Sequence, residues 1–543
     1  MAIIRKLVNQ SVKQFVSPSV ASSKRVVSTS PRVEQGAAAI SLESPALQQC
    51  PFMKSGSAMA DDSTSLQEVT NVQPFSSMPG PKGLPVLGTL LDYFKKDGPR
   101  FNKMFDVYRQ RALEFGDIYY EKVGHFHSVV VSSPEAYNRL VHAEGKYPHR
   151  RPMVPIEYYR KQKGIDLGIV NSQGEPWYKQ RTVASKKMLK LSEVTSFSAE
   201  MGEVADDFMK RLSSARNAQG EVPAVEREFF KWAMESMGTF LFEERIGCLG
   251  AQPTPLAQSF IENMEGFFKK LQPLMYNMPF YKLWATKTWK QFEHYSDNVM
   301  DIGRSIVEKK MASMESDNGS KSAFISYLLD SGTMSTKEVT ALVIDLMTAA
   351  VETTSTAMVW CLYNLAKNPQ VQEKIYAEIS EAKAANNGSI SAEELSRLPL
   401  VKAVVKETLR LYPITYATSR NVQEDIELLG YRIPAGTHVQ ANLYGMYHNP
   451  ELFPNPEEFL PERWLRGEQM DATIKSTSQL IWGHGARMCI GRRLAEQEMH
   501  ITLSKIIQNF TLSYNHDDVE PVLNTMMTPD RPVLVQFTPR EQH

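Results

Sequence analysis

The chain has 543 residues, of which 42% are hydrophobic and 22% are charged, a composition that is ordinary for a globular protein. Its formal net charge is zero, which argues against a protein that binds nucleic acid through a broad basic surface. The four cysteines, at positions 50, 248, 361 and 489, form no C-x-x-C pair and accompany no histidine cluster, so neither a zinc site nor a disulfide framework is expected.

The N-terminal segment, residues 1–33, is basic, rich in serine and free of Asp and Glu. Its apolar residues recur at helical spacing, with the basic residues largely off that stripe. This composition is typical of a mitochondrial transit peptide, and a disordered basic tail is the alternative. Residues 34–77 are rich in Ser and Ala and poor in aromatics, which predicts a flexible linker. A folded domain is then expected over residues 78–543.

Two features precede the longest predicted helix. Trp177 and Arg181 are four residues apart, so both fall on one face of a helix. Residues 266–284 are rich in aromatics and Met, with interspersed Lys. Such a segment suits peripheral contact with a membrane surface. A loop packed on the protein beside a substrate entrance fits the same composition equally well.

A long apolar helix is predicted from near Thr336, and it contains the run AAVETT at 349–354. Glu352 and Thr353 lie in this run, although a Thr within a helix often simply donates its hydroxyl to a preceding carbonyl. Farther on, Glu407 and Arg410 are three residues apart and can pair on one helix face.

Cys489 lies in the run WGHGARMCIG, residues 482–491. Gly483 and Gly485 allow a tight turn whose backbone can approach a flat ligand. Arg487 offers a planar fork of donors to a carboxylate. The following residues read as a helix, and a helix N-terminus favours the thiolate form of a nearby cysteine. A thiolate on such a turn is a suitable axial ligand for haem iron.

These motifs, in this order, resemble those of the haem-thiolate monooxygenases, the cytochrome P450 family, over roughly residues 75 to 540. The chain departs from the usual family pattern at two positions. Trp482 stands where the family usually has Phe, and Ala350 stands where Gly is more usual. The first change keeps a large aromatic, so only local repacking is expected there. The second means that any kink in the helix must have another source.

The resemblance implies a mainly α (α+β) fold, large and helical, with a small β-rich portion. It implies haem b as cofactor, with Cys489 as the axial ligand of the iron, and proton delivery during oxygen activation by Thr353 and Glu352. Further cofactor contacts are expected from Arg487, Trp177, Arg181, Trp482, Gly483 and Gly491. A structural network is expected from Glu407, Arg410 and Arg463.

The leader favours the mitochondrial animal branch of the family, because endoplasmic-reticulum members begin instead with an apolar anchor. In that branch, basic residues dock an acidic [2Fe–2S] ferredoxin of the adrenodoxin type, which an NADPH-dependent reductase supplies with electrons. The matching residues here are Lys402, Lys406, Arg492 and Arg493. An ordinary solvated face is the alternative for the lysine pair, since residues four apart share one helix face anyway.

The implied reaction inserts one oxygen atom of O2 into a lipophilic substrate, with a steroid favoured. The implied location is mitochondrial, on the matrix side of the inner membrane. A detoxifying monooxygenase, an oxygen-independent isomerase or peroxygenase, and a haem-binding sensor or carrier are the other functions considered. The presence of both Glu352 and Thr353 counts against the isomerase or peroxygenase and against the sensor or carrier.

Overall fold

The structure, a computed structural model, describes residues 72–242, 244–316, 324–465, 477 and 480–541. The proposed leader and most of the proposed linker, residues 1–71, lie outside these ranges. Helices make up 59% of the structure and strands 11%, which confirms the predicted mainly helical fold with a small β-rich portion.

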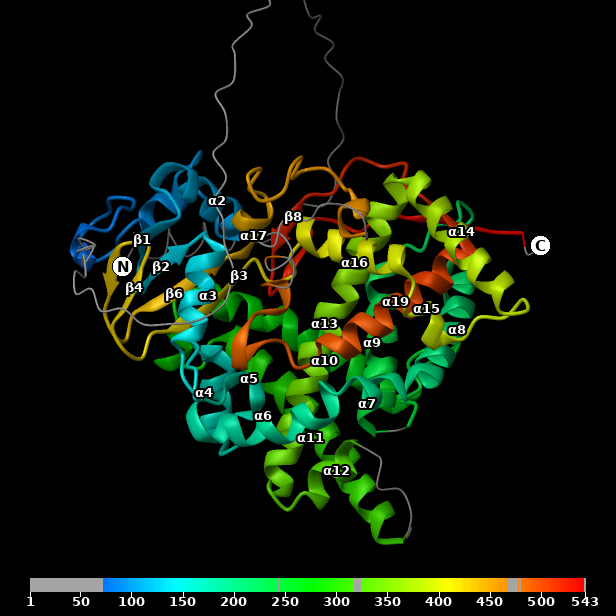
Figure 1. Cartoon of the computed structure of the whole chain (residues 1–543). Coiled ribbons are helices and arrows are strands. Elements are labelled where there is room, and N and C mark those ends of the chain that lie inside the picture. Colours follow the sequence, from blue (N-terminus) through cyan, green and yellow to red (C-terminus); the bar gives the residue numbers. More distant parts are fainter. Residues whose placement is uncertain (1–71, 243, 317–323, 466–476, 478–479, 542–543) are drawn as a thin grey trace, which may run out of the picture. The chain divides into compact units, whose positions relative to one another are not determined.

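The described part consists of a small β-rich portion and a larger body of helices (Figure 1). The helices with ten or more residues are α2 (Met104–Phe115), α4 (Val154–Lys163), α6 (Gly174–Met188), α8 (Ser198–Ala215), α9 (Val225–Phe242), α10 (Pro255–Tyr276), α11 (Lys287–Ser316), α13 (Thr336–Lys367), α14 (Pro369–Ala385), α16 (Pro399–Leu411) and α19 (Arg492–Asn509). Shorter ones are α3 (Pro134–His142), α5 (Gly168–Asn171), α7 (Leu191–Thr195), α12 (Phe324–Asp330), α15 (Ala392–Leu395) and α17 (Leu443–Tyr447).

The largest sheet has four strands in the order β1-β2-β6-β3. These are β1 (Ile118–Val123), β2 (Phe126–Val131), β6 (His438–Asn442) and β3 (Ala417–Asn421). Strands β2 and β6, which lie about three hundred residues apart in the sequence, pair in parallel, with Val130 opposite Gln440. Three two-stranded sheets pair β4 (Ile426–Leu428) with β5 (Tyr431–Ile433), β7 (Phe510–Ser513) with β10 (Gln536–Pro539), and β8 (Pro521–Leu523) with β9 (Met527–Pro529).

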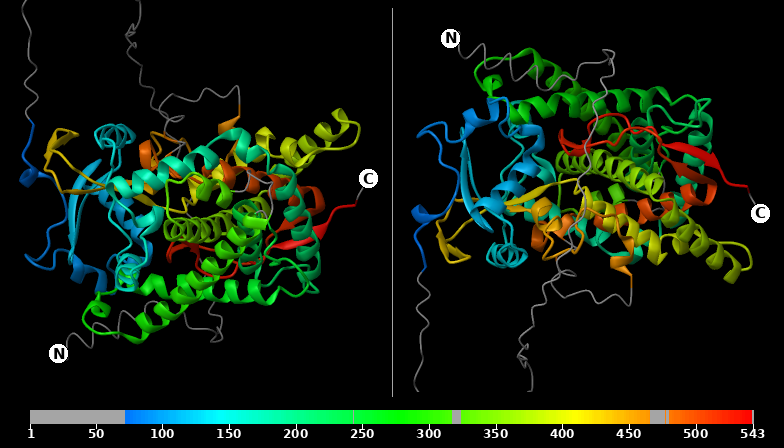
Figure 2. Two further views of the ribbon diagram at one scale, coloured as in Figure 1. Left: turned by 90° about the horizontal axis from the view of Figure 1, so that it is seen from below. Right: turned by 90° about the horizontal axis from the view of Figure 1, so that it is seen from above.

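Helix α13 runs through the middle of the helical body, as the two views along the vertical direction also show (Figure 2). Its first turn is closed by a capping box between Ser335 and Glu338. By length and composition alone it could cross a membrane, but 67% of its most apolar window is buried inside the protein. It packs against α9, α5, α16 and α19 and is therefore the central core helix.

The folded unit begins at Val72. Gln73 donates its backbone N–H to the carbonyl of Gly430 at 2.8 Å, and the Phe75 ring packs edge-on against Tyr120. Residues 73–77 thus already contact the sheet portion, a few residues before the domain boundary that the sequence suggested at 78.

Candidate functional site

A buried polar network holds α16 to the segment around residues 454–464. The Glu407 carboxylate accepts from Arg410 Nε and Nη2 at 3.0 and 2.9 Å and from Arg463 Nε at 3.0 Å. It also accepts from the Trp464 indole at 2.8 Å and from the backbone N–H of Leu460 at 3.0 Å. The three residues predicted to form a network are therefore in contact, and the indole is a partner that the sequence motif did not predict.

The cysteine loop lies between η6 (Leu480–Trp482) and α19, and η7 (Gly485–Arg487) is part of it. Gly485 has φ +71°, and a Cβ there would lie 2.3 Å from a Val141 methyl group, so this position requires glycine. The backbone N–H of Cys489 donates to the carbonyl of Trp482 at 2.6 Å and closes the loop. The loop thus fixes the cysteine immediately before α19.

The Cys489 side chain is surrounded by protein atoms on a larger scale, yet the side chain itself is accessible to solvent. The two observations agree if the side chain faces an internal space. Burial raises the pKa of the thiol, while a backbone hydrogen bond from Gly491 and the charges of Arg181 and Arg150 lower it. The sequence-based expectation that the helix terminus pushes the free thiol toward thiolate is wrong in this respect, because α19 begins three residues later, at Arg492, and burial outweighs its effect.

Arg487 is held in place by three acceptors and an aromatic ring. Its Nε donates to the Pro148 carbonyl at 3.0 Å, and its Nη2 donates to Ser172 O and Gln173 Oε1, both at 2.9 Å. The guanidinium lies 3.9 Å above the Trp177 ring. Its Nη1 is buried without a hydrogen-bond partner among the described residues. This donor is therefore fixed in position and available to a ligand.

Four arginines gather around this point. Burial, followed by the charges of Arg150, Arg420 and Arg181, lowers the pKa of Arg487 to about 8. Burial and two of the same neighbours lower the pKa of Arg150 to about 10. Glu144, which pairs with Arg420, is the acidic group that acts on Arg487. The cluster thus has an excess of buried positive charge, and the two propionates of a haem would balance it.

Sequence reasoning identified Arg181 and Arg487 but missed Arg150 and Arg420. Arg420 lies on β3, where it donates to the carbonyl of His484 in the cysteine loop at 3.0 Å. Arg150 lies in an irregular segment before α4. Neither position belongs to a motif. The backbone N–H of Asn421 donates to the His149 carbonyl at 2.9 Å, and this bridge brings the segments of the two arginines together.

One stretch of α13 is open in an otherwise buried helix. Residues 339–347, 351 and 354–366 are buried, whereas the five positions between them are not. Those five are Thr348, Ala349, Ala350, Glu352 and Thr353. Since this stretch lies at mid-length of the core helix, we infer that it faces an internal cavity. The predicted acid and hydroxyl residues are therefore among those that line it.

Glu352 and Thr353 differ in their hydrogen bonding. Thr353 donates its hydroxyl to the Ala349 carbonyl at 2.7 Å, the back-bonding that the sequence left as an alternative. Its oxygen retains the capacity to accept a hydrogen bond. Glu352 Oε2 is buried without a hydrogen-bond partner among the described residues. Burial raises the pKa of Glu352 to about 8, so this carboxyl is mostly protonated at neutral pH.

Three of the four residues predicted to bind the ferredoxin line a separate hollow of about 250 Å³ beside the cysteine loop. Lys402, Lys406 and Arg492 line it, together with Trp482 and Glu496. Arg492 pairs with Glu496 at 3.1 Å, and burial and the neighbouring Lys406 lower the pKa of Lys402. Arg493 is exposed at the start of α19 but does not line this hollow.

The chain matches the family model described as "Cytochrome P450" over residues 78–537. It therefore belongs to the cytochrome P450 family, whose members are haem-thiolate monooxygenases. It is 71% identical to "Cytochrome P450 10" of Lymnaea stagnalis over 545 residues, which cover 100% of both chains.

Two of the more distant relatives have names that include the word mitochondrial. The "Cholesterol side-chain cleavage enzyme, mitochondrial" of Oncorhynchus mykiss is 32% identical over 89% of this chain and 93% of that protein. The "1,25-dihydroxyvitamin D(3) 24-hydroxylase, mitochondrial" of Rattus norvegicus is 30% identical over 90% of this chain and 92% of that protein.

Proposed function

We propose that this monooxygenase hydroxylates a steroid-like lipophilic substrate in mitochondria, with Cys489 as the axial ligand of its haem and a ferredoxin as its electron donor. The observation that carries the site assignment is the buried arginine cluster beside the Cys489 thiol. Together they offer a sulfur ligand to iron and four cations to the carboxylates of the same flat group.

When bound, the haem supplies the redox chemistry that activates O2 and transfers one of its oxygen atoms to the substrate. The chain's own residues would bind and orient the haem, and they would carry protons to the site. Arg487 and Arg181 would hold the propionates, and the Trp177 ring, over which the Arg487 guanidinium lies, supports that guanidinium. Trp482, Gly483 and Gly491 belong to the loop that carries the thiol. Glu352 holds a proton at its buried carboxyl, and the Thr353 oxygen, whose own hydroxyl hydrogen is anchored to the Ala349 carbonyl, can accept a hydrogen bond from the group to which that proton passes.

The names of two relatives support the substrate class, since one acts on cholesterol and the other on a vitamin D derivative. The same names, together with the basic leader at 1–33, support a mitochondrial location on the matrix side of the inner membrane. A foreign lipophilic compound is the alternative substrate. A screen of sterols and foreign compounds for shifts of the haem absorption band distinguishes the two, because only a bound substrate displaces water from the cavity.

The hollow lined by Lys402, Lys406 and Arg492 supports an acidic ferredoxin as the partner. The hollow adjoins the cysteine loop through Trp482, so a protein docked there lies close to the thiol. Lys406 is exposed, and a local positive patch on a chain of zero net charge steers an acidic protein to one place.

The test is turnover with an adrenodoxin-type ferredoxin and its NADPH reductase, compared with a microsomal flavin reductase. We expect efficient turnover only with the ferredoxin. K402Q/K406Q should raise the ferredoxin Km roughly 2- to 30-fold, because each exposed pair contributes ~0.2–1 kcal/mol. K287Q/K290Q removes the same charge elsewhere and should leave this Km unchanged.

Turnover without any donor would favour the isomerase or peroxygenase alternative. Equal turnover with the microsomal reductase would overturn the ferredoxin assignment. For the location, residues 1–40 fused to a reporter should direct it to mitochondria, and a cytosolic reporter would contradict that part of the proposal.

A further inference from the structure

A tyrosine at the end of α10 faces the same internal space as the open stretch of α13. Tyr276 is surrounded by protein atoms on a larger scale, yet part of its side chain is accessible to solvent, as at Cys489. Its hydroxyl interacts electrostatically with the Glu352 carboxyl, although the structure describes no hydrogen bond between them. Since Glu352 belongs to the open stretch, Tyr276 lies beside the same cavity.

The Tyr276 hydroxyl has a hydrogen-bond donor that the protein does not use. Among the residues that the structure describes, this hydroxyl has no hydrogen-bond partner. Burial, followed by the nearby Glu352 carboxyl, raises the pKa of Tyr276 to about 12, so the hydroxyl keeps its proton at neutral pH. A tyrosine hydroxyl inside a protein usually has a partner, because leaving it unpaired costs free energy. A ligand in the cavity would supply that partner.

Three other hydroxyls near this space already have partners. Thr348 and Thr353 of α13 donate to backbone carbonyls one turn earlier, at 2.8 and 2.7 Å. Tyr416, on which Tyr276 acts electrostatically, packs edge-on against Tyr108 with ring centroids 5.5 Å apart, and those two hydroxyls interact. Tyr276 differs from these three residues because its donor is unused.

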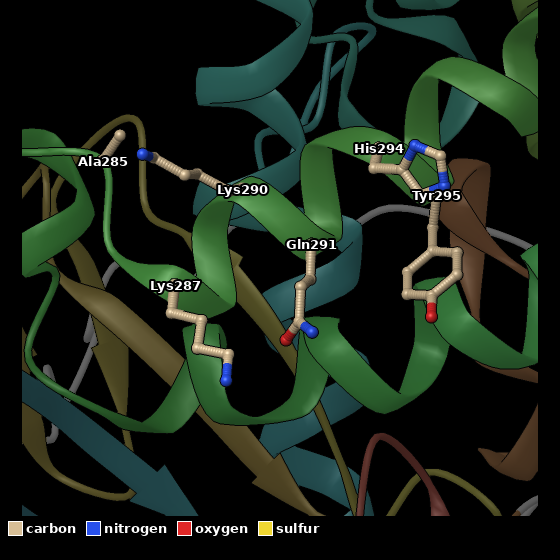
Figure 3. A pocket seen from close by; sticks show the side chains of 6 residues that line it. All are labelled: Ala285, Lys287, Lys290, Gln291, His294 and Tyr295. Atoms are coloured by element: carbon tan, nitrogen blue, oxygen red, sulfur yellow. The ribbon is translucent and has the colours of Figure 1, made fainter.

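Helix α10, which carries this tyrosine, is held on two sides. Tyr295 of α11 lies against Gly266, where a Cβ would be only 2.5 Å from the tyrosine ring, so the two helices pack closely. The Tyr295 side chain also lines an open hollow at the start of α11 (Figure 3). One turn before Tyr276, Gln272 donates its side-chain amide to Asn524 Oδ1 at 3.0 Å, in the turn between β8 and β9. Tyr276 is therefore carried by a helix whose position is fixed.

We propose that Tyr276 is a specificity residue whose hydroxyl forms a hydrogen bond with a hydroxyl or carbonyl oxygen of an otherwise apolar substrate. The inference rests on the proposed function only in that a lipophilic substrate occupies this cavity. A tyrosine hydroxyl can donate to a carbonyl, and it can donate to or accept from a hydroxyl. Ala349 and Ala350 add no polar side chain to the open stretch, so the apolar body of the substrate packs there while Tyr276 fixes its orientation.

The experiment compares the affinities of matched probes for the haem-loaded full chain, by titration of the shift of the haem absorption band. Cholesterol and cholestenone each carry one oxygen atom, and cholestene is the corresponding hydrocarbon. Dodecanol and dodecane form a second pair that is unrelated to steroids. In Y276F, the ratio of the oxygen-bearing probe's affinity to the hydrocarbon's should fall roughly 2- to 12-fold, the contribution of one hydrogen bond. The affinity for the hydrocarbon itself should not fall.

Two tyrosine variants are the controls. Y416F removes a second hydroxyl near the same space, and Y514F removes a hydroxyl that donates to the Asp517 carbonyl at 2.8 Å. Both should keep the wild-type ratio. An unchanged ratio in Y276F would overturn the proposal, and so would a ratio that falls in Y416F but not in Y276F. The absorption spectrum of each variant without a probe checks that the fold is intact.

Failure of the proposed steroid substrate gives a different result from failure of this inference. If the substrate is not a steroid, no sterol shifts the haem band in wild type or in Y276F, whereas the ratio for dodecanol and dodecane still falls in Y276F. If wild type responds to no oxygen-bearing probe at all, the inference about Tyr276 is wrong as well.

Discussion

The network around Glu407 and the cluster around Arg487 are both built from buried charges, but they differ in how completely those charges are paired. Arg410 uses all its donors: two bonds reach Glu407, and three reach the carbonyls of Tyr447, Pro456 and Glu458 at 2.7–3.0 Å. Arg487 lies among three other arginines and keeps Nη1 without a partner among the described residues.

This difference separates a structural role from a binding role. A buried charge that is fully hydrogen-bonded stabilises the fold in which its partners meet, and the chain needs nothing more there. Buried cations without enough acids around them are unfavourable unless a ligand supplies the missing negative charge. The comparison therefore assigns Arg410 to the fold and Arg487 to the cofactor, although both occur in short sequence motifs.

The largest expected effect follows from removing the thiol. C489H should abolish monooxygenase activity, because an imidazole does not donate electron density to iron as a thiolate does. The measurement is the absorption band of the reduced, carbon monoxide-bound protein, which should lose the red shift typical of thiolate ligation. C248S, at a buried cysteine outside the site, is the matched control. An unchanged band in C489H would show that another residue binds the iron.

Breaking the paired network should cost the most folding free energy. R410A leaves the buried Glu407 without two of its donors and should lower the free energy of unfolding by ~3–5 kcal/mol. Since a domain has ~5–15 kcal/mol in total, little haem-loaded protein should accumulate. R397A removes one partner of an exposed pair with Glu393 and should cost less than ~1 kcal/mol. Equal stability of the two variants, by urea unfolding, would contradict the structural role of the network.

Removing a charge from the unpaired cluster should weaken haem binding more than it lowers the stability of the fold. R487L relieves repulsion among the arginines, so the apoprotein should lose less stability than R410A does. Haem retention should fall, because a donor for a propionate is gone. The measurement is haem transfer to apomyoglobin, which should be ~10–100-fold faster than in wild type. If R487L destabilises the apoprotein as much as R410A and retains haem normally, Arg487 belongs to the fold.

The sequence predicted the parts of this site that lie in local motifs. The mainly helical fold, the core helix near Thr336 and the helix after Cys489 follow from apolar periodicity, and all three are observed. The Glu407–Arg410 contact follows from a spacing of three on one helix face. Local patterns carry this information because the residues concerned lie within one turn of each other.

The remaining parts depend on contacts between distant segments. Arg150 and Arg420 belong to no motif, and the bridge between their neighbours His149 and Asn421 brings their segments together. The burial that raises the pKa of Cys489 and of Glu352 is a property of the packed core, which no pattern around either residue reveals. The exposure of Leu283 and Trp284, against the burial of Tyr281, likewise required the structure.

The smallest expected effect concerns the hydroxyl at the open stretch of α13. T353A removes the bond to Ala349 but no buried charge, and an alanine is a good helix former. The haem spectrum and the thermal stability should therefore stay close to wild type. Proton delivery should suffer, so a larger share of the NADPH consumed should appear as hydrogen peroxide instead of product.

Two neighbouring variants sharpen this last prediction. T353S keeps a hydroxyl and should restore most of the coupling between NADPH consumption and product. T354A changes a threonine that is only 3% exposed, so it should lower stability through lost packing while leaving coupling unchanged. If T353A leaves the ratio of product to NADPH unaltered while T354A lowers it, the proton path runs through Thr354. The open stretch of α13 would then contribute the shape of the cavity and not its chemistry.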